Sequence, residues 1–330
     1  MSSQKLYKFS SSPHVKSSSS TKRIMLDVVI ALLPATVMGI VLFGLNAFLL
    51  IAISLLSAVA SEFIYLLICK KTFREIINGF DFSSLVTGLL IGLSIGSQTP
   101  LYIPIFASAF AIIVVKMIFG GTGKNLVNPA VTGRIFIFMS FTSLMTSGWS
   151  NPSIPSLSGD FITTGATVLG GLLDSTLPSL SNIDLLLGFG VAGCIGETCK
   201  VALILGGVYL AIRKVINIGY PIIYIAVTGL FSVALNGFDF ALFLPSILSG
   251  GLMLGAIFMA TDYTTSPNTT LGNVIYFILL GLVTAGLRVA TGLEVVSFAI
   301  LLLNLFVPLI DKFIINRPFG YFKAKKQKGE

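Results

Sequence analysis

Long apolar runs separated by short polar breaks fill almost the whole chain, and most runs are about as long as a membrane crossing. A helix needs about 20 apolar residues to span a bilayer core of roughly 30 Å. The runs predict about ten helices, at 24–44, 46–69, 83–98, 101–120, 130–147, 185–212, 218–236, 241–260, 272–290 and 293–315. The pattern therefore predicts an all-α integral membrane protein.

Composition supports the membrane class. Apolar residues make up 55% of the 330 positions and charged residues 10%, with a mean hydropathy of +0.96. Soluble globular domains carry about 25% charged residues. The net charge of +8 is explained by basic membrane margins. We expect no nucleic-acid binding, because no basic groove with interleaved aromatic residues is present.

The basic residues gather in alternate links between the predicted helices. They are Lys5, Lys8, Lys16, Lys22 and Arg23 before the first span, Lys70, Lys71 and Arg74 after the second, Lys124 and Arg134 after the fourth, Arg213 and Lys214 after the sixth, and Arg317, Lys323, Lys325, Lys326 and Lys328 in the tail. Lys and Arg favour the cytoplasmic side, so both termini are predicted to be cytoplasmic. Among the links assigned outside, only that near Arg288 is basic.

Two small-residue segments, 88–100 and 250–267, each end in a polar turn with proline. In the predicted topology one runs outward and the other inward, as expected for two five-helix halves related by an inverted repeat with broken helices. The predicted organisation is a flexible cytoplasmic arm at 1–22, a first membrane repeat at 23–147, an extracytoplasmic loop at 148–184, a second membrane repeat at 185–316 and a basic cytoplasmic tail at 317–330.

A glycine- and asparagine-rich link follows the fourth predicted span, and its candidate binding residues are Gly120, Gly121, Thr122, Asn125 and Asn128. One interpretation is a reverse turn with a proline that starts the next helix. The other is that its open backbone and amide groups line a cavity that holds an isoalloxazine ring or an ion.

Charged residues within predicted spans are costly and suggest function. Glu197 and Lys200 follow a run of glycines that predicts a broken or re-entrant sixth helix, and Asp262 stands near the end of the eighth span. We consider these three residues a possible ion path. Alternatively, Glu197 and Lys200, three positions apart, neutralise each other and lock helix packing. No catalytic triad or metal-ligand cluster is visible.

One long loop carries no Lys or Arg and is therefore predicted to face outward. It contains Thr164, Gly165, Ala166 and Thr167 in succession. Such a loop has little to pack against, so its sequence favours a chemical role over a folding role.

Four motifs in a fixed order carry a family resemblance: 119–130, 164–167, 196–198, and 260–262 with 265–267. Together they resemble the RnfD/NqrB family, the membrane subunits of the sodium-translocating Rnf (ferredoxin:NAD) and Nqr (NADH:quinone) oxidoreductases. The resemblance covers residues 22–317. The short N-terminal arm is more similar to RnfD than to NqrB.

The resemblance implies FMN attached through its phosphate to Thr167 by a separate flavin transferase, with Thr164, Gly165 and Ala166 as recognition context. NqrB-like members also hold a riboflavin, which implies a second flavin near Gly120 to Asn128. The chain would carry electrons in a bacterial cytoplasmic membrane, coupled to Na⁺ or H⁺ translocation. Other Rnf membrane and peripheral subunits would bind ferredoxin and NAD, so this translocase subunit has no complete active site alone.

Two alternatives stay open. An NqrB-type subunit would deliver electrons toward quinone. A flavin-free channel or transporter for a small solute would use the similar, urea-transporter-like arrangement of inverted repeats.

Overall fold

The computed structural model describes residues 20–147, 149, 182–188 and 191–315, and this part of the chain is mainly helical; an antiparallel bridge joins Gly96 and Cys194. The α-helices are α1 (Thr21–Ile68), α2 (Phe73–Gly79), α3 (Ser83–Leu93), α4 (Ile103–Ala109), α5 (Pro129–Ser140), α6 (Thr142–Ser147), α8 (Asn182–Leu187), α9 (Lys200–Ile212), α10 (Gly219–Leu235), α11 (Phe243–Leu248), α12 (Leu252–Leu254), α13 (Thr270–Thr291) and α14 (Val296–Phe313). The π-helix η1 (Phe110–Met117) continues α4, the 3₁₀-helix η2 (Phe240–Leu242) precedes α11, and the π-helix η3 (Gly255–Met259) continues α12. The all-α prediction is confirmed for the described residues.

Helix α1 consists of two membrane-length helices joined at a kink. A straight helix of its 48 residues would be about 72 Å long, more than twice the thickness of a bilayer core. Gly44 breaks it with φ 70° and ψ −152°, a conformation that only glycine adopts easily. Gly44 is the last residue of the first predicted span, so the break lies next to the predicted boundary between the first two spans.

Helix α3 packs directly on the second half of α1 because its contact face is made of glycine. A Cβ atom added to Gly88 would lie 2.8 Å from the Leu55 Cα, and one added to Gly92 would lie 3.0 Å from the Ile51 Cα. The Ser54 hydroxyl donates to the Gly88 carbonyl across this contact at 2.8 Å. Small residues thus let two backbones approach closely, as is common between membrane helices.

Both halves of the chain contain a helix pair with a sharp bend. Helices α2 and α3 meet at 69°, and η2–α11 meets α12–η3 at 65°. Ser83 at the start of α3 and Thr261 after η3 line the same cavity. At the opposite ends, the Ser94 and Gly250 carbonyls both accept hydrogen bonds from the 194–200 segment. Helix α3 and helix η3 therefore run antiparallel, as an inverted repeat requires.

The helix count agrees with the sequence only in part. Among the described residues, three helices are long and apolar enough to cross a membrane, or five if each bent pair forms one span. The sixth predicted span is interrupted, as its glycines indicated: helix α8 ends at Leu187 and α9 begins only at Lys200. The complete ten-helix layout of two repeats and its boundaries stay a prediction.

The surface of the helices carries large apolar side chains. Leu45, Leu56, Ile212 and Phe313 are between 66% and 77% exposed, and similar residues lie along every long helix. Apolar exposure on this scale indicates contact with lipid. The chain is therefore a multi-pass membrane protein.

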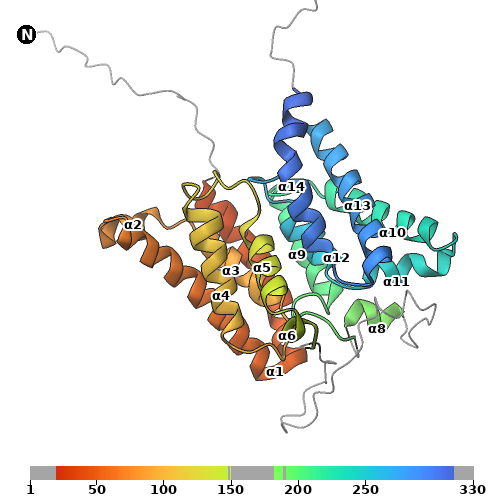
Figure 1. Ribbon diagram of the computed structural model, residues 1–330, viewed down its shortest axis with the longest axis horizontal. Coiled ribbons are helices and arrows are strands. Elements are labelled where there is room, and N and C mark those ends of the chain that lie inside the picture. The colour runs from red at the N-terminus through yellow and green to blue at the C-terminus, as the bar shows by residue number, and fades with distance from the viewer. Residues whose placement is uncertain (1–19, 148, 150–181, 189–190, 316–330) are drawn as a thin grey trace, which may run out of the picture.

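The two ends of the described chain lie on one side of the helical bundle. Figure 1 shows the start of α1 and the end of α14 near the top, whereas α6 and α8 lie near the bottom. The motif formed by Thr164, Gly165, Ala166 and Thr167 falls between α6 and α8 in the sequence and lies outside the described residues.

Candidate functional site

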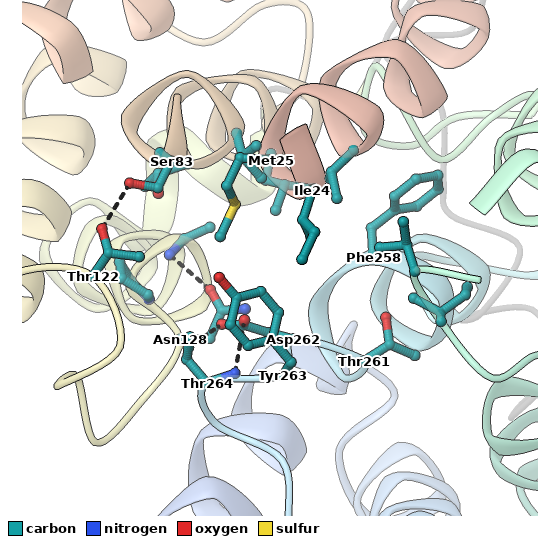
Figure 2. A pocket seen from close by; sticks show the side chains of 18 of the residues that line it. Ile24, Met25, Ser83, Thr122, Asn128, Phe258, Thr261, Asp262, Tyr263 and Thr264 are labelled. Atoms are coloured by element: carbon teal, nitrogen blue, oxygen red, sulfur yellow. Dashed lines mark hydrogen bonds between the residues drawn. The ribbon is translucent and has the colours of Figure 1, made fainter. Parts of the chain in front are cut away.

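A cavity on the side of the bundle that carries α2 and the start of α1 combines residues of both halves of the chain. Its empty space of about 750 Å³ includes a part that is open to solvent. We call it the asparagine cavity. Its lining consists of Ile24, Met25, Val28, Ser83, Val86, Thr87, Leu90, Lys116, Thr122, Asn125, Asn128, Pro129, Ala130, Leu210, Val215, Ile216, Ile257, Phe258, Thr261, Asp262, Tyr263 and Thr264. Figure 2 shows the apolar side chains of Ile24, Met25 and Phe258 facing the polar groups of Thr122, Asn128 and Asp262.

Asn128 joins the two halves at this cavity. Its Oδ1 accepts from the backbone N–H groups of Ala130 at 3.0 Å and Val131 at 3.4 Å, so it caps helix α5. Its Nδ2 donates to the Met259 carbonyl at the end of η3, at 3.1 Å. Because both ends of the amide are occupied, Asn128 positions the cavity wall.

Asn125 and Asp262 form the next part of the polar wall. The Asn125 Nδ2 donates to the Thr264 hydroxyl at 3.4 Å, and this hydroxyl donates to Asp262 Oδ2 at 2.9 Å. The Thr264 N–H donates to Asp262 Oδ1 at 3.2 Å. Burial raises the pKa of the Asp262 carboxyl group, although the hydrogen bonds from Thr264 oppose this shift. The sequence predictions for Asn125 and Asp262 thus converge on one site.

The predicted binding residues of the glycine-rich link do not all reach this cavity. Thr122, Asn125 and Asn128 line it, whereas Gly120 and Gly121 line a neighbouring cavity. Gly120 and Gly121 have φ values of 106° and 91°, which L side chains rarely adopt. The turn interpretation therefore accounts for these two glycines, and the cavity interpretation fits the other three residues.

A second cavity lies at the opposite ends of α3 and η3. Its empty space of about 740 Å³ includes open solvent, and it is lined by Arg134, Ile135, Phe138, Met145, Thr146, Trp149, Val191, Ala192, Glu197, Gly250, Leu293, Glu294, Ser297 and Phe298. We call it the arginine cavity. The Arg134 guanidinium donates to the Ser297 hydroxyl at 3.1 Å and contacts the Cys194 sulfur at 3.5 Å.

Several further charges are buried around the arginine cavity. Arg288 Nη2 lies 3.5 Å from Glu294 Oε2, and Arg288 Nη1 donates to the Ser246 carbonyl at 2.9 Å. Glu197 Oε2 and Glu294 Oε1 are buried without a hydrogen-bond partner. Buried acceptors of this kind are expensive unless a ligand or water pairs with them.

The predicted pairing of Glu197 with Lys200 is wrong in its geometry. Glu197 lies in a turn before α9, and its Oε1 accepts from the Cys194 N–H at 2.8 Å. The Lys200 ammonium instead donates to two backbone carbonyls, those of Glu197 and Gly250. The helix does not extend to Glu197, so the three-residue spacing does not place the side chains together. Asp262 lies in the other cavity, so the three residues do not form one contiguous site.

Residues 8–320 match the NQR2, RnfD, RnfE family over nearly the whole chain. This chain belongs to that family. The resemblance recognised in the sequence is therefore confirmed.

The curated relatives that the chain matches include D subunits of ion-translocating oxidoreductase complexes. It is 41% identical to the D subunit of the Na⁺-translocating ferredoxin:NAD⁺ oxidoreductase complex of Acetobacterium woodii, with 96% of each chain covered. It is 35% identical to the D subunit of the proton-translocating ferredoxin:NAD⁺ oxidoreductase complex of Clostridium ljungdahlii, again with 96% of each chain covered. The D subunit of the ion-translocating oxidoreductase complex of Stutzerimonas stutzeri is 33% identical, over 92% of this chain and 93% of that protein.

Four charged residues of this RnfD-like chain, all buried or partly buried, differ from the sequence predictions. The interpretation of Arg134 as a basic residue at the cytoplasmic margin is wrong, because it is buried at 6% exposure in the arginine cavity. Glu294 and Lys116 have no counterpart among the predicted site residues, although both line cavities. The signal that could have found them is an isolated charge beside or within an apolar run. Arg288 is also buried. The link near Arg288 is therefore no longer an exception to the rule that basic residues lie in the links predicted to be cytoplasmic.

Proposed function

We propose that this chain is the RnfD-type membrane subunit of an Rnf complex, which carries electrons between ferredoxin and NAD through bound flavins and couples this transfer to Na⁺ or H⁺ translocation. The observation that carries the proposal is the likeness to the RnfD-type relatives along essentially the full length of both chains. Other subunits of the complex would bind ferredoxin and NAD. The membrane would be the bacterial cytoplasmic membrane, with both termini on the cytoplasmic side.

We assign the covalent FMN to Thr167, in an extracytoplasmic loop, with Thr164, Gly165 and Ala166 as the sequence that a flavin transferase recognises. When bound, a flavin supplies one-electron chemistry, and the protein supplies orientation and electrostatic tuning. Support comes from the family, whose Ser/Thr-Gly-Ala-Thr motif this sequence matches.

The asparagine cavity is the place that we propose for a second flavin, such as riboflavin. An isoalloxazine ring is flat and largely apolar, with hydrogen-bonding groups along one edge. The cavity offers apolar side chains on one wall and the Thr122, Asp262 and Thr264 side chains on the other. Asn125 and Asn128 would hold this polar wall in place rather than bind the ring by themselves.

The ion path would use the buried polar groups near both cavities. Glu197 and Lys200 lie beside the arginine cavity, and Asp262 lies in the asparagine cavity. Each of these three residues is therefore a candidate for a separate position along the ion path. Coupling requires that ion affinity differ between two states of the protein.

Peptide mass spectrometry tests the covalent flavin. The wild-type chain and a Thr167→Ala variant are expressed with a flavin transferase, with Thr163→Ala as the matched control. We expect the mass of FMN minus water on the peptide that contains Thr167, retained in the control and lost in Thr167→Ala. An unmodified wild-type peptide beside an active transferase would favour the solute-transporter alternative.

A cavity-filling variant tests the second flavin. Val86 lines the asparagine cavity, whereas Val114 on η1 is 38% exposed on the outer surface. In the Thr167→Ala background, Val86→Trp should abolish any noncovalent flavin that co-purifies, and Val114→Trp should retain it. Equal flavin content in both variants would remove the asparagine cavity as the second site.

A further inference from the structure

Lys116 is an ammonium group buried inside the helical bundle. The residue is only 2% exposed and belongs to the π-helix η1. Its Nζ donates to Glu62 Oε1 at 2.9 Å and to the Ser83 hydroxyl at 2.6 Å, and it lies 3.9 Å from Asp81 Oδ1. π-Helical turns are rare and occur frequently at functional sites.

The ammonium lies at the wall between two cavities. On one side is the asparagine cavity. On the other is a cavity of about 580 Å³ between α1, α2 and the glycine-rich link, which we call the lysine pocket. Besides Lys116, the lysine pocket contains one ammonium, Lys71, and three carboxylates, Glu62, Glu75 and Asp81. Without the Lys116 charge, this pocket would have a clear excess of negative charge.

The groups around the ammonium are oxygen ligands that suit a hard cation. Glu62 is 7% exposed, and its Oε2 is buried without a hydrogen-bond partner. Asp81 Oδ1 accepts from the Ser83 hydroxyl at 2.6 Å, and this hydroxyl lies 3.0 Å from the Thr122 hydroxyl. Hard cations without a soft-ligand preference bind carboxylate and hydroxyl oxygens of this kind.

We propose that Glu62, Asp81, Ser83 and Thr122 form a Na⁺ site, which the Lys116 ammonium occupies in this structure and vacates when negative charge enters the asparagine cavity. Lysine suits this role because its compact charge sits on a flexible four-carbon stem. The ammonium and Na⁺ carry the same charge, so each excludes the other from the carboxylates by repulsion.

The exchange couples the two cavities electrostatically. Negative charge in the asparagine cavity attracts the ammonium away from Glu62, because the two charges interact at short range in a poorly screened interior. Glu62 and Asp81 then lack this counter-ion, and Na⁺ binding replaces the positive charge that has left the pocket. This trigger rests on the proposed function, whereas the existence of the cation site does not.

The site is tested without any flavin by Lys116→Met, which keeps the length of the side chain and removes its charge. Binding of radioactive Na⁺ to the purified full-length chain is measured at constant ionic strength, with choline as the replacement cation. We expect one saturable site with an affinity about tenfold or more above that of the flavin-free wild type, in line with the coupling of close charge pairs. Lys214→Met, at an exposed position, is the matched control and should bind as the wild type does.

Glu62→Gln in the Lys116→Met background should remove the added Na⁺ binding. If Lys116→Met does not fold, Lys116→Gln carries the same test, because its amide can still hydrogen-bond with Glu62 and Ser83. A folded, neutral variant that binds no Na⁺, or that binds it equally well after Glu62→Gln, would overturn the site.

The trigger has its own measurement in the wild-type complex. Reduction with dithionite should raise Na⁺ binding to the level of Lys116→Met. If Lys116→Met binds Na⁺ through Glu62 and the reduced complex does not, the trigger is overturned and the cation site is retained. Failure of the proposed function would be seen separately, as the absence of flavin from the Thr167 peptide.

Discussion

Replacement of Asn128 by alanine should weaken the contact between the two halves of the chain and the start of helix α5 together. The cap bonds to Ala130 and Val131 would be lost, which typically costs about 1 kcal/mol. The Met259 carbonyl would lose its donor in a buried position, which costs about 1–3 kcal/mol. Because the two losses occur at different groups, we expect Asn128→Ala to destabilise the protein by about 2–4 kcal/mol.

Asn128→Ser separates these contributions. A serine hydroxyl can cap the helix but is too short to reach the Met259 carbonyl. Unfolding is measured by titration with sodium dodecyl sulfate in mixed micelles, followed by circular dichroism. We expect Asn128→Ser to recover about 1 kcal/mol of the alanine penalty and to remain less stable than the wild type.

Two results would refute this reasoning. A loss below about 0.5 kcal/mol in Asn128→Ala, the lower limit for a helix cap, would mean that neither contact contributes. Equal losses in Asn128→Ala and Asn128→Ser would mean that the cap contributes nothing and that the bond to Met259 carries the whole effect.

Two further changes test packing and buried charge. Gly206→Ala would place a Cβ atom on the Ala31 carbonyl oxygen of helix α1, whereas Gly286 has no atom within 4 Å of an added Cβ. In the same micelle titration, we expect Gly206→Ala to destabilise the protein by about 1–3 kcal/mol and Gly286→Ala to stabilise it by about 0.4–1 kcal/mol. A Gly206→Ala variant as stable as the wild type would contradict the close packing. Because the pKa of Asp262 is raised in the folded protein, the folded protein loses stability as the pH rises through this folded-state pKa and the carboxyl group ionises. Asp262→Asn should therefore have a higher midpoint of thermal unfolding than the wild type at pH 8, and this difference in midpoint should shrink toward pH 4. An advantage that does not depend on pH would show that the hydrogen bonds from Thr264, and not the charge, decide the difference.

The sequence predicted best the features that local chemistry determines. Gly44 separates two apolar runs of membrane length, and the kink of α1 occurs at this residue. The glycines before Glu197 predicted a broken helix, and the chain between α8 and α9 is non-helical where it is described. In both places the backbone freedom of glycine permits the break.

The sequence could not predict features that depend on residues far apart in the chain. Lys116 lies in an apolar run, and its partner Glu62 is 54 positions away. The same holds for Asn128, whose partner Met259 is 131 positions away. Glu197 and Lys200 show the opposite error, because a short spacing suggested a pairing that the turn before α9 prevents. Spacing predicts contacts only where the element between two residues is known.

The antiparallel course of α3 and η3 explains why the chain has a cavity with polar and charged side chains on each of two sides. Helix α3 has 11 residues and is therefore about 16 Å long, and the asparagine and arginine cavities lie at its opposite ends. The buried apolar residues Leu89, Ile91 and Leu93 of α3 line neither cavity, so ion movement between the cavities along this helix would require a change of conformation. Electrons need no such opening. If electron transfer is to drive the movement of ions, the two cavities must be separated by an apolar barrier. Without this barrier, ions could move between the cavities in the absence of electron transfer.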